Sequence, residues 1–127
     1  MNKAKKILVI DDELDILTYF EAIFQDNGYD SVSAMNGVEG FELAKSEKPD
    51  LITLDITMPT QSGLKVYRQF KTHNALKNIP IIIITAFDDF MEAYFDELYN
   101  LGHPEGIFYK PIDPRKIMKL VAKILSD

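Results

Sequence analysis

Five apolar runs alternate with five amphipathic stretches along this chain of 127 residues. Lys6–Ile10 and Ile79–Ile84 are almost continuously apolar, which is typical of strands covered on both faces. Three further segments have the length of a strand: Tyr29–Ala34, Asp50–Leu54 and Gly106–Tyr109. The first of these is a weak strand, because Val32 is its one strong β-former. Alternating strands and helices predict a parallel sheet with helices on both faces.

The stretches between these runs repeat their apolar residues at helical spacing. The first helix is predicted from Asp12 to Asn27, and Gly28 is a typical helix stop. Further helices are expected after Asn36, over Leu64–His73, over Asp88–Leu101, and after Asp113-Pro114, an N-cap followed by proline. Their expected buried residues are Val38, Phe41 and Ala44; Val66, Tyr67 and Phe70; Met91, Tyr94, Phe95 and Leu98; and Ile117, Leu120, Val121 and Ile124.

Polar side chains stand at the carboxyl ends of four of the predicted strands. They are Asp11 and Asp12, Asp55, Thr85 and Lys110. Taken singly, each is an ordinary turn or surface residue. The hydrophobic pattern does not reveal the strand order, but ligands of open parallel sheets bind beyond the carboxyl ends of the strands. Three carboxylates, a hydroxyl and an ammonium at that edge predict a site for a divalent cation and a phosphoryl group.

Composition narrows the class of protein. The length predicts one domain over residues 1–127, and 46% apolar residues indicate a globular fold. The chain has no cysteine, which excludes disulfides and thiol chemistry. No apolar run is long enough for a membrane span, and a net charge of −6 argues against nucleic-acid binding. A cytoplasmic protein is the expected result.

Four segments of the chain resemble the receiver domain of bacterial two-component response regulators. They are ILVIDDE at 7–13, LITLDITMPTQSG at 51–63, IPIIIITA at 79–86 and FYKPID at 108–113. The resemblance covers essentially the whole chain. It implies a flavodoxin-like (βα)5 fold, a three-layer sandwich whose five-stranded parallel sheet has the order 2-1-3-4-5.

The resemblance also implies a Mg²⁺ site. Asp12, Asp55 and the backbone carbonyl of Thr57 would bind the ion directly, and Asp11 would act mostly through a bound water. This set of ligands suits the ion, because carboxylates at close range repel one another and Mg²⁺ prefers hard oxygen ligands.

By the same resemblance, Asp55 accepts a phosphoryl group from a sensor histidine kinase or a histidine phosphotransfer protein. Lys110 would neutralise the phosphoryl oxygens, and Thr85 would donate a hydrogen bond once the group is present. The family implies a cis bond between Lys110 and Pro111. Phosphoryl transfer needs positioning and charge neutralisation rather than covalent chemistry from the protein. The chain is therefore expected to be a phosphoacceptor that assists its own reactions, and not an enzyme.

The output is expected at the face formed by the fourth helix, fifth strand and fifth helix. The family usually has a switch aromatic three residues before the lysine, where this chain has Ile107. The segment from Ala86 to Gly106 is longer than usual and rich in aromatics, with Phe87 two residues past Thr85. We therefore expect this segment to move, with Thr85 as the trigger. A downstream protein and a second copy of the chain both stay open as its partner.

Two other classes stay open. A phosphatase of the haloacid dehalogenase type also uses a strand-end aspartate with Mg²⁺, but it needs a second aspartate two residues later, where this chain has Thr57. The other is a receiver within a longer regulator, whose DNA-binding or enzymatic output domain would follow Asp127.

Overall fold

Five parallel strands form one sheet in the order β2-β1-β3-β4-β5, which confirms the predicted topology. The computed structural model of the chain describes residues 4–57, 63–86 and 91–126. The elements are β1 (Lys6–Ile10), α1 (Leu14–Asp26), β2 (Asp30–Ala34), α2 (Gly37–Glu47), β3 (Leu51–Leu54), α3 (Gly63–Thr72), β4 (Ile81–Thr85), α4 (Met91–Leu101), β5 (Gly106–Tyr109) and α5 (Pro114–Leu125).

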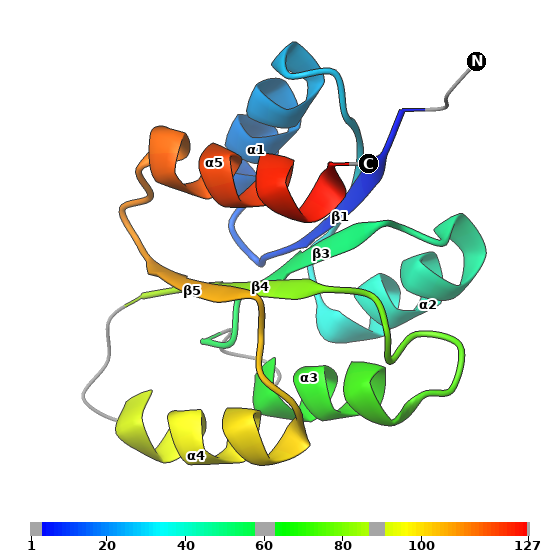
Figure 1. The fold of residues 1–127 in the computed structure, drawn as a ribbon, viewed down its shortest axis with the longest axis vertical. Coiled ribbons are helices and arrows are strands. Elements are labelled where there is room, and N and C mark those ends of the chain that lie inside the picture. Colours follow the sequence, from blue (N-terminus) through cyan, green and yellow to red (C-terminus); the bar gives the residue numbers. More distant parts are fainter. Residues whose placement is uncertain (1–3, 58–62, 87–90, 127) are drawn as a thin grey trace.

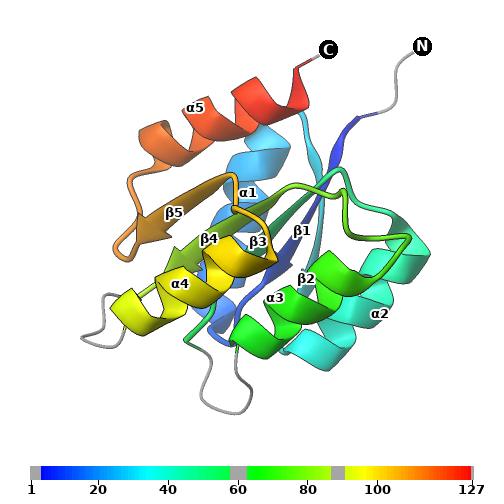
Figure 2. The same cartoon turned by 60° about the horizontal axis from the view of Figure 1, so that its bottom comes forward.

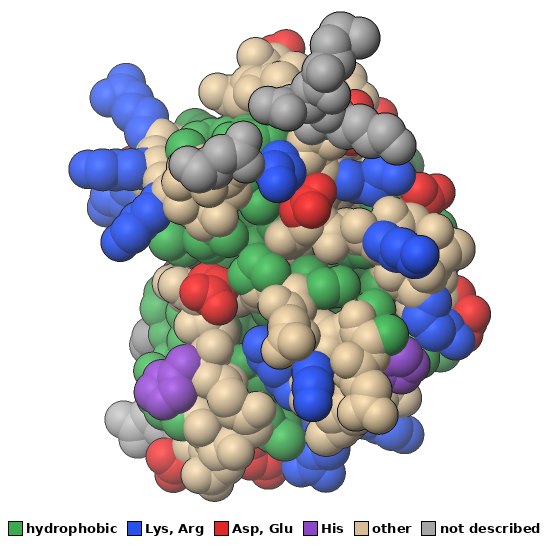
Figure 3. Space-filling view, turned by 45° about the vertical axis from the view of Figure 1, so that its right-hand side comes forward, with side chains coloured by type: hydrophobic (Ala, Val, Ile, Leu, Met, Phe, Trp, Pro, Cys, Tyr) green, Lys and Arg blue, Asp and Glu red, His purple; other side chains and the backbone are tan. Residues whose placement is uncertain are grey.

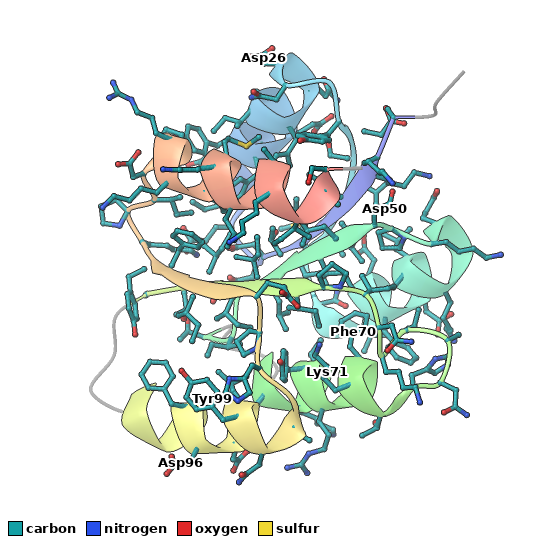
Figure 4. The ribbon with its side chains drawn as sticks, in the orientation of Figure 1. Asp26, Asp50, Phe70, Lys71, Asp96 and Tyr99 are labelled. Carbon is teal, nitrogen blue, oxygen red and sulfur yellow. The ribbon has the colours of Figure 1, made fainter. Side chains whose placement is uncertain are left out.

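The sheet is the middle of three layers (Figure 1). Helices α1 and α5 cover one face, and α2, α3 and α4 cover the other. Side chains along β1 alternate between the two cores, since Ile7 and Val9 pack with α1 and α5 while Leu8 and Ile10 pack with the other three helices. Phe70 lies between α3 and the sheet (Figure 4) and is fully buried. Burial on both faces explains why these strands are continuously apolar.

Strand β4 differs by one or two residues from the prediction. It begins at Ile81, because Pro80 has no N–H for the ladder, although the Pro80 carbonyl accepts a hydrogen bond from the Ile52 N–H at 3.0 Å. At the other end it includes Thr85, which pairs with Tyr109. The backbone N–H of Lys110 donates to the Thr85 carbonyl at 2.9 Å, so Thr85 and Lys110 leave the sheet side by side.

The helix ends follow from local side chains. Asn36 and Asp113 cap α2 and α5 as predicted, each accepting a backbone N–H through its side-chain oxygen. Gly28 has a φ of 85°, the left-handed conformation expected of a helix stop. Helix α1 begins at Leu14, two residues later than predicted, because the Asp11 carboxylate accepts the Glu13 N–H at 2.9 Å and holds the chain in a turn.

The prediction for the buried face of α2 is confirmed at Ala44 and at Phe41, which packs partly buried against the core, but it is wrong at Val38. Val38 is 67% exposed, and the residues that face the sheet are Gly37, Gly40 and Ala44. A Cβ atom at Gly40 would lie 2.5 Å from Cδ1 of Ile10, so the helix backbone packs directly on β1. Apolar periodicity missed the two glycines because a glycine carries no hydrophobic side chain to mark its position.

The other predicted buried faces agree with the structure where it describes them. Val66, Tyr67, Leu98, Ile117 and Val121 are buried. Phe87 and Phe90, and the loop at 58–62, lie outside the described residues, as do the side chains of Met91 and Tyr94. Among the helices described, none has the length and apolar character that a membrane crossing requires. Basic and acidic side chains are mixed over the face shown in Figure 3.

Candidate functional site

The carboxyl ends of β1 and β3 bring two buried aspartates together. The strands are neighbours, and Ile10 pairs with Leu54, so Asp11 and Asp55 follow at adjacent positions. The Asp55 N–H donates to the Ile10 carbonyl at 3.0 Å, which extends the ladder to the aspartate itself. Each aspartate is only 2% exposed. The carboxyl ends of all five strands lie at this edge of the sheet (Figure 2), and ligands of open parallel sheets bind at such an edge.

Four carboxylates converge at this edge. Oxygens of Asp11, Asp12, Glu13 and Asp55 all lie within 4.8 Å of one another. Asp12 is half-buried, whereas Glu13 is exposed. Such a set of hard oxygen donors fits Mg²⁺ or a similar divalent cation. The structure thus brings together all three predicted carboxylates and adds Glu13, which the sequence argument had not placed in the site.

Lys110 reaches this cluster from the end of β5. Its Nζ lies 3.0 Å from Asp11, 3.0 Å from Glu13 and 3.2 Å from Asp55. The peptide bond to Pro111 is cis, as the resemblance implies. Burial alone would lower the pKa of the ammonium, but the hydrogen bonds to Glu13 and Asp11 and the nearby charge of Asp55 together raise it above its ordinary value. Lys110 is therefore charged at every physiological pH.

Burial also shifts the pKa of the Asp11 carboxyl. Loss of hydration raises the pKa of Asp11 from 3.8 to about 6, and the charge of Asp55 adds to that rise. The Glu13 N–H and the Lys110 ammonium oppose it by stabilising the carboxylate. Among the described residues of the site, four carboxyl groups lie around one ammonium.

A chain of hydroxyl groups links Asp55 to β4. Both the N–H and the hydroxyl of Thr57 donate to Oδ1 of Asp55 at 2.8 Å. The hydroxyl of Thr85, fully buried, donates to the Thr57 hydroxyl at 3.2 Å. The prediction had included Thr57 only through its carbonyl. A threonine two residues after an aspartate often forms such a turn, and this signal could have found the side-chain contact.

Ile107 lies on β5, where it pairs with Ile83 and packs partly buried against the α2, α3 and α4 core. Its aliphatic side chain takes the position at which the family usually has a switch aromatic. Exposed aromatic rings do occur nearby, since Tyr99 on α4 (Figure 4) is 47% exposed and Tyr109 is 37% exposed.

Residues 7–122 match the family model described as the response regulator receiver domain. The chain belongs to this family. It is a receiver domain of the two-component signalling type. The match runs from the second residue of β1 to most of α5 and includes all residues of the candidate site.

Characterised proteins agree with this assignment. The chain is 31% identical over 123 residues to the polar-differentiation response regulator DivK of Brucella anthropi, covering 97% of this chain and 98% of DivK. It is 36% identical over 122 residues to the alkaline phosphatase synthesis transcriptional regulatory protein PhoP of Bacillus subtilis, covering 95% of this chain but 48% of PhoP. The chain thus spans about half the length of one relative and nearly all of the other.

A solved structure shows the same fold. The chemotaxis protein CheY4 of Vibrio cholerae superposes with a TM-score of 0.85 at 25% identity, covering 96% of this chain and 99% of CheY4. The flavodoxin-like fold predicted from the resemblance is therefore confirmed.

Proposed function

We propose that Asp55 accepts a phosphoryl group and that this reaction is the biochemical function of the domain. The observation that supports it best is the environment of the Asp55 carboxylate, which is almost fully buried yet lies 3.2 Å from the Lys110 ammonium at the open edge of the sheet. A structural aspartate has no need of a convergent cluster of acids. Thr57 supplies no second carboxylate, so nothing favours the phosphatase alternative.

The chain is proposed to act as a phosphoacceptor and not as an enzyme with a substrate of its own. An oxygen of Asp55 attacks phosphorus in a phosphohistidine, the P–O bond forms as the P–N bond breaks, and the electron pair returns to the imidazole of the donor. Lys110 is close enough to donate to a phosphoryl oxygen on Asp55. Thr85 is linked to Asp55 through Thr57 and can turn its hydroxyl toward the new group.

Mg²⁺ is the proposed cofactor. Receiver domains typically bind it at an acidic pocket, and Asp11, Asp12 and Asp55 with the Thr57 carbonyl would hold it here. When bound, the ion would supply positive charge against the carboxylates and the phosphoryl oxygens.

A sensor histidine kinase or a histidine phosphotransfer protein is the proposed donor. Three exposed apolar residues lie on the segments that surround the acidic cluster, and they offer the donor protein a surface to bind. Leu14 follows Glu13 at the start of α1, Met35 follows Ala34, whose carbonyl accepts the Asp11 N–H, and Val38 lies in the first turn of α2. ATP charges such kinases in the cytoplasm, so this role implies a cytoplasmic location.

The proposed output face is formed by α4, β5 and α5. Thr85 is the trigger because it ends β4 and begins the connection to α4. The Tyr67 hydroxyl donates to the Gly102 carbonyl and ties the end of α4 to α3, so this end is the natural pivot of the motion. The exposed rings of Tyr99 and Tyr109 suit a protein partner, either a downstream target, an output domain or a second copy.

The test is phosphorylation by a small acyl phosphate in the presence of Mg²⁺, followed by intact mass. Wild type is expected to gain one phosphoryl group, and Asp55→Asn none. Asp26→Asn is the matched control, because Asp26 is an exposed aspartate at the far end of α1 (Figure 4). Full labelling of Asp55→Asn at another acid would refute the assignment of Asp55.

A further inference from the structure

Lys110 is the one cation that contacts the candidate site within the described residues, and its hydrogen-bonding capacity is fully used. An ammonium has three N–H donors, and Asp11, Glu13 and Asp55 each lie within 3.2 Å of Nζ. Two of these acceptors are buried parts of the site itself. The third, Glu13, has a side chain that is 58% exposed, and it comes from outside the buried cluster.

Glu13 can keep this contact because its side chain does not cap its own helix. It is the N-cap residue of α1, but its side chain makes no capping hydrogen bond to that helix. Its carboxylate instead accepts a hydrogen bond from the Lys110 ammonium, which lies 97 positions away in the sequence. A glutamate is a poor N-cap, whereas aspartate is among the best. The side chain is thus committed to the lysine and not to the helix.

A phosphoryl group on Asp55 would need one of these three N–H donors. The carboxylate of Glu13 would oppose that in two ways, since it holds one donor and it places a negative charge within 4.8 Å of an Asp55 oxygen. Asp11 and Asp55 would still hold Lys110 in place if Glu13 were removed.

We propose that Glu13 is a positioning residue that competes with the phosphoryl group for Lys110 and so weakens the hold of the site on that group. The inference rests on the proposed function of Asp55. It makes the residue after the paired aspartates a determinant of how strongly this receiver retains its signal.

The experiment measures the affinity for beryllofluoride, a trigonal anion that mimics a phosphoryl group on a carboxylate. Calorimetric titrations are run on the intact chain at a Mg²⁺ concentration that saturates each variant, as established by a separate Mg²⁺ titration. Glu13→Gln keeps the shape and removes the charge. Binding is expected to become about two- to fivefold tighter, the range expected for loss of a partly exposed ion pair.

Two further variants separate the contact from the charge. Glu13→Asp keeps the charge, but a shorter carboxylate at the N-cap position has the backbone amides of α1 to bind instead of Lys110. It is expected to tighten binding as well, by less than Glu13→Gln. Asp15→Asn removes a charge from the same first turn, at an exposed position outside the contacts of Lys110, and it is expected to leave the affinity unchanged.

Several results would overturn the inference. The first is unchanged or weaker beryllofluoride binding in Glu13→Gln. The second is an equal gain in beryllofluoride affinity in Asp15→Asn. The third is a gain in affinity in Glu13→Gln with no gain in Glu13→Asp, which would indicate an effect of charge alone. A loss of Mg²⁺ affinity as large as that of Asp12→Asn would make Glu13 a metal ligand instead. If wild type binds no beryllofluoride with Mg²⁺, the proposed function fails and this inference with it, whereas wild-type binding equal to that of Glu13→Gln refutes the inference alone.

Discussion

Replacement of Asp11 by asparagine is predicted to stabilise the metal-free protein at pH 7. The pKa of Asp11 rises from 3.8 to about 6 on folding, because burial disfavours the carboxylate and Asp55 adds like charge. One pKa unit corresponds to about 1.4 kcal/mol, so the ionised side chain destabilises the fold by up to about 3 kcal/mol. Asparagine resembles the protonated acid in shape and carries no charge, and its oxygen can still accept the Glu13 N–H.

The dependence on pH follows from the direction of this shift. The folded state binds the Asp11 proton more tightly than the unfolded chain does, so the contribution of Asp11 favours the fold at low pH. That advantage is lost as the pH rises from about 4 through 6, and the full penalty applies at pH 7. Local relaxation reduces the gain, and we expect Asp11→Asn to add about 1 to 2 kcal/mol at pH 7 and much less at pH 4.5.

Urea unfolding in the presence of a chelator, at pH 4.5 and pH 7, measures this difference. Other acids titrate over the same range, and subtraction of the wild-type curve removes their contribution. Asp26→Asn serves as the control for loss of a single exposed carboxylate. Added Mg²⁺ should stabilise wild type more than Asp11→Asn, because the ion relieves the same repulsion. A variant less stable than wild type at pH 7, or a gain equal at both pH values, would refute the reasoning.

Three further predictions concern the phosphoryl response and the backbone beneath it. Lys110→Ala should retain Mg²⁺ binding in a calorimetric titration but lose the conformational response to beryllofluoride, and a normal response would make Lys110 a surface residue. Hydrogen exchange should change most over 87–103 when the mimic binds, and Thr85→Ala should abolish that change, whereas unchanged exchange at an occupied site would place the output elsewhere. Gly63→Ala should lower the free energy of unfolding by about 1 to 3 kcal/mol in urea, because its Cβ would lie 2.1 Å from Cα of Ile56, and near-wild-type stability would contradict that packing.

Much of this protein could be predicted from its sequence, since the physical signals involved are local. Continuous apolar strands, helical spacing and the caps at Asn36 and Asp113 depend on near neighbours along the chain. The polar residues after the strands were also readable, and a parallel sheet necessarily gathers them at one edge. The order of the strands and the metal ligands came from resemblance to a family, because apolar periodicity carries no information on which strands are neighbours.

The tertiary structure decided what depends on contacts across the chain. Gly40 packs against Ile10, so Val38 faces solvent although its position in the periodic pattern favours burial. Glu13 lies 97 positions from Lys110, and one ion pair joins them because the parallel sheet brings the carboxyl ends of β1 and β5 to the same edge. The rise in the pKa of Asp11 has the same origin, because desolvation and the charge of Asp55 act through space and not along the sequence. The sequence specified the side chains of this site, and the fold determined the distances between them and the pKa of Asp11.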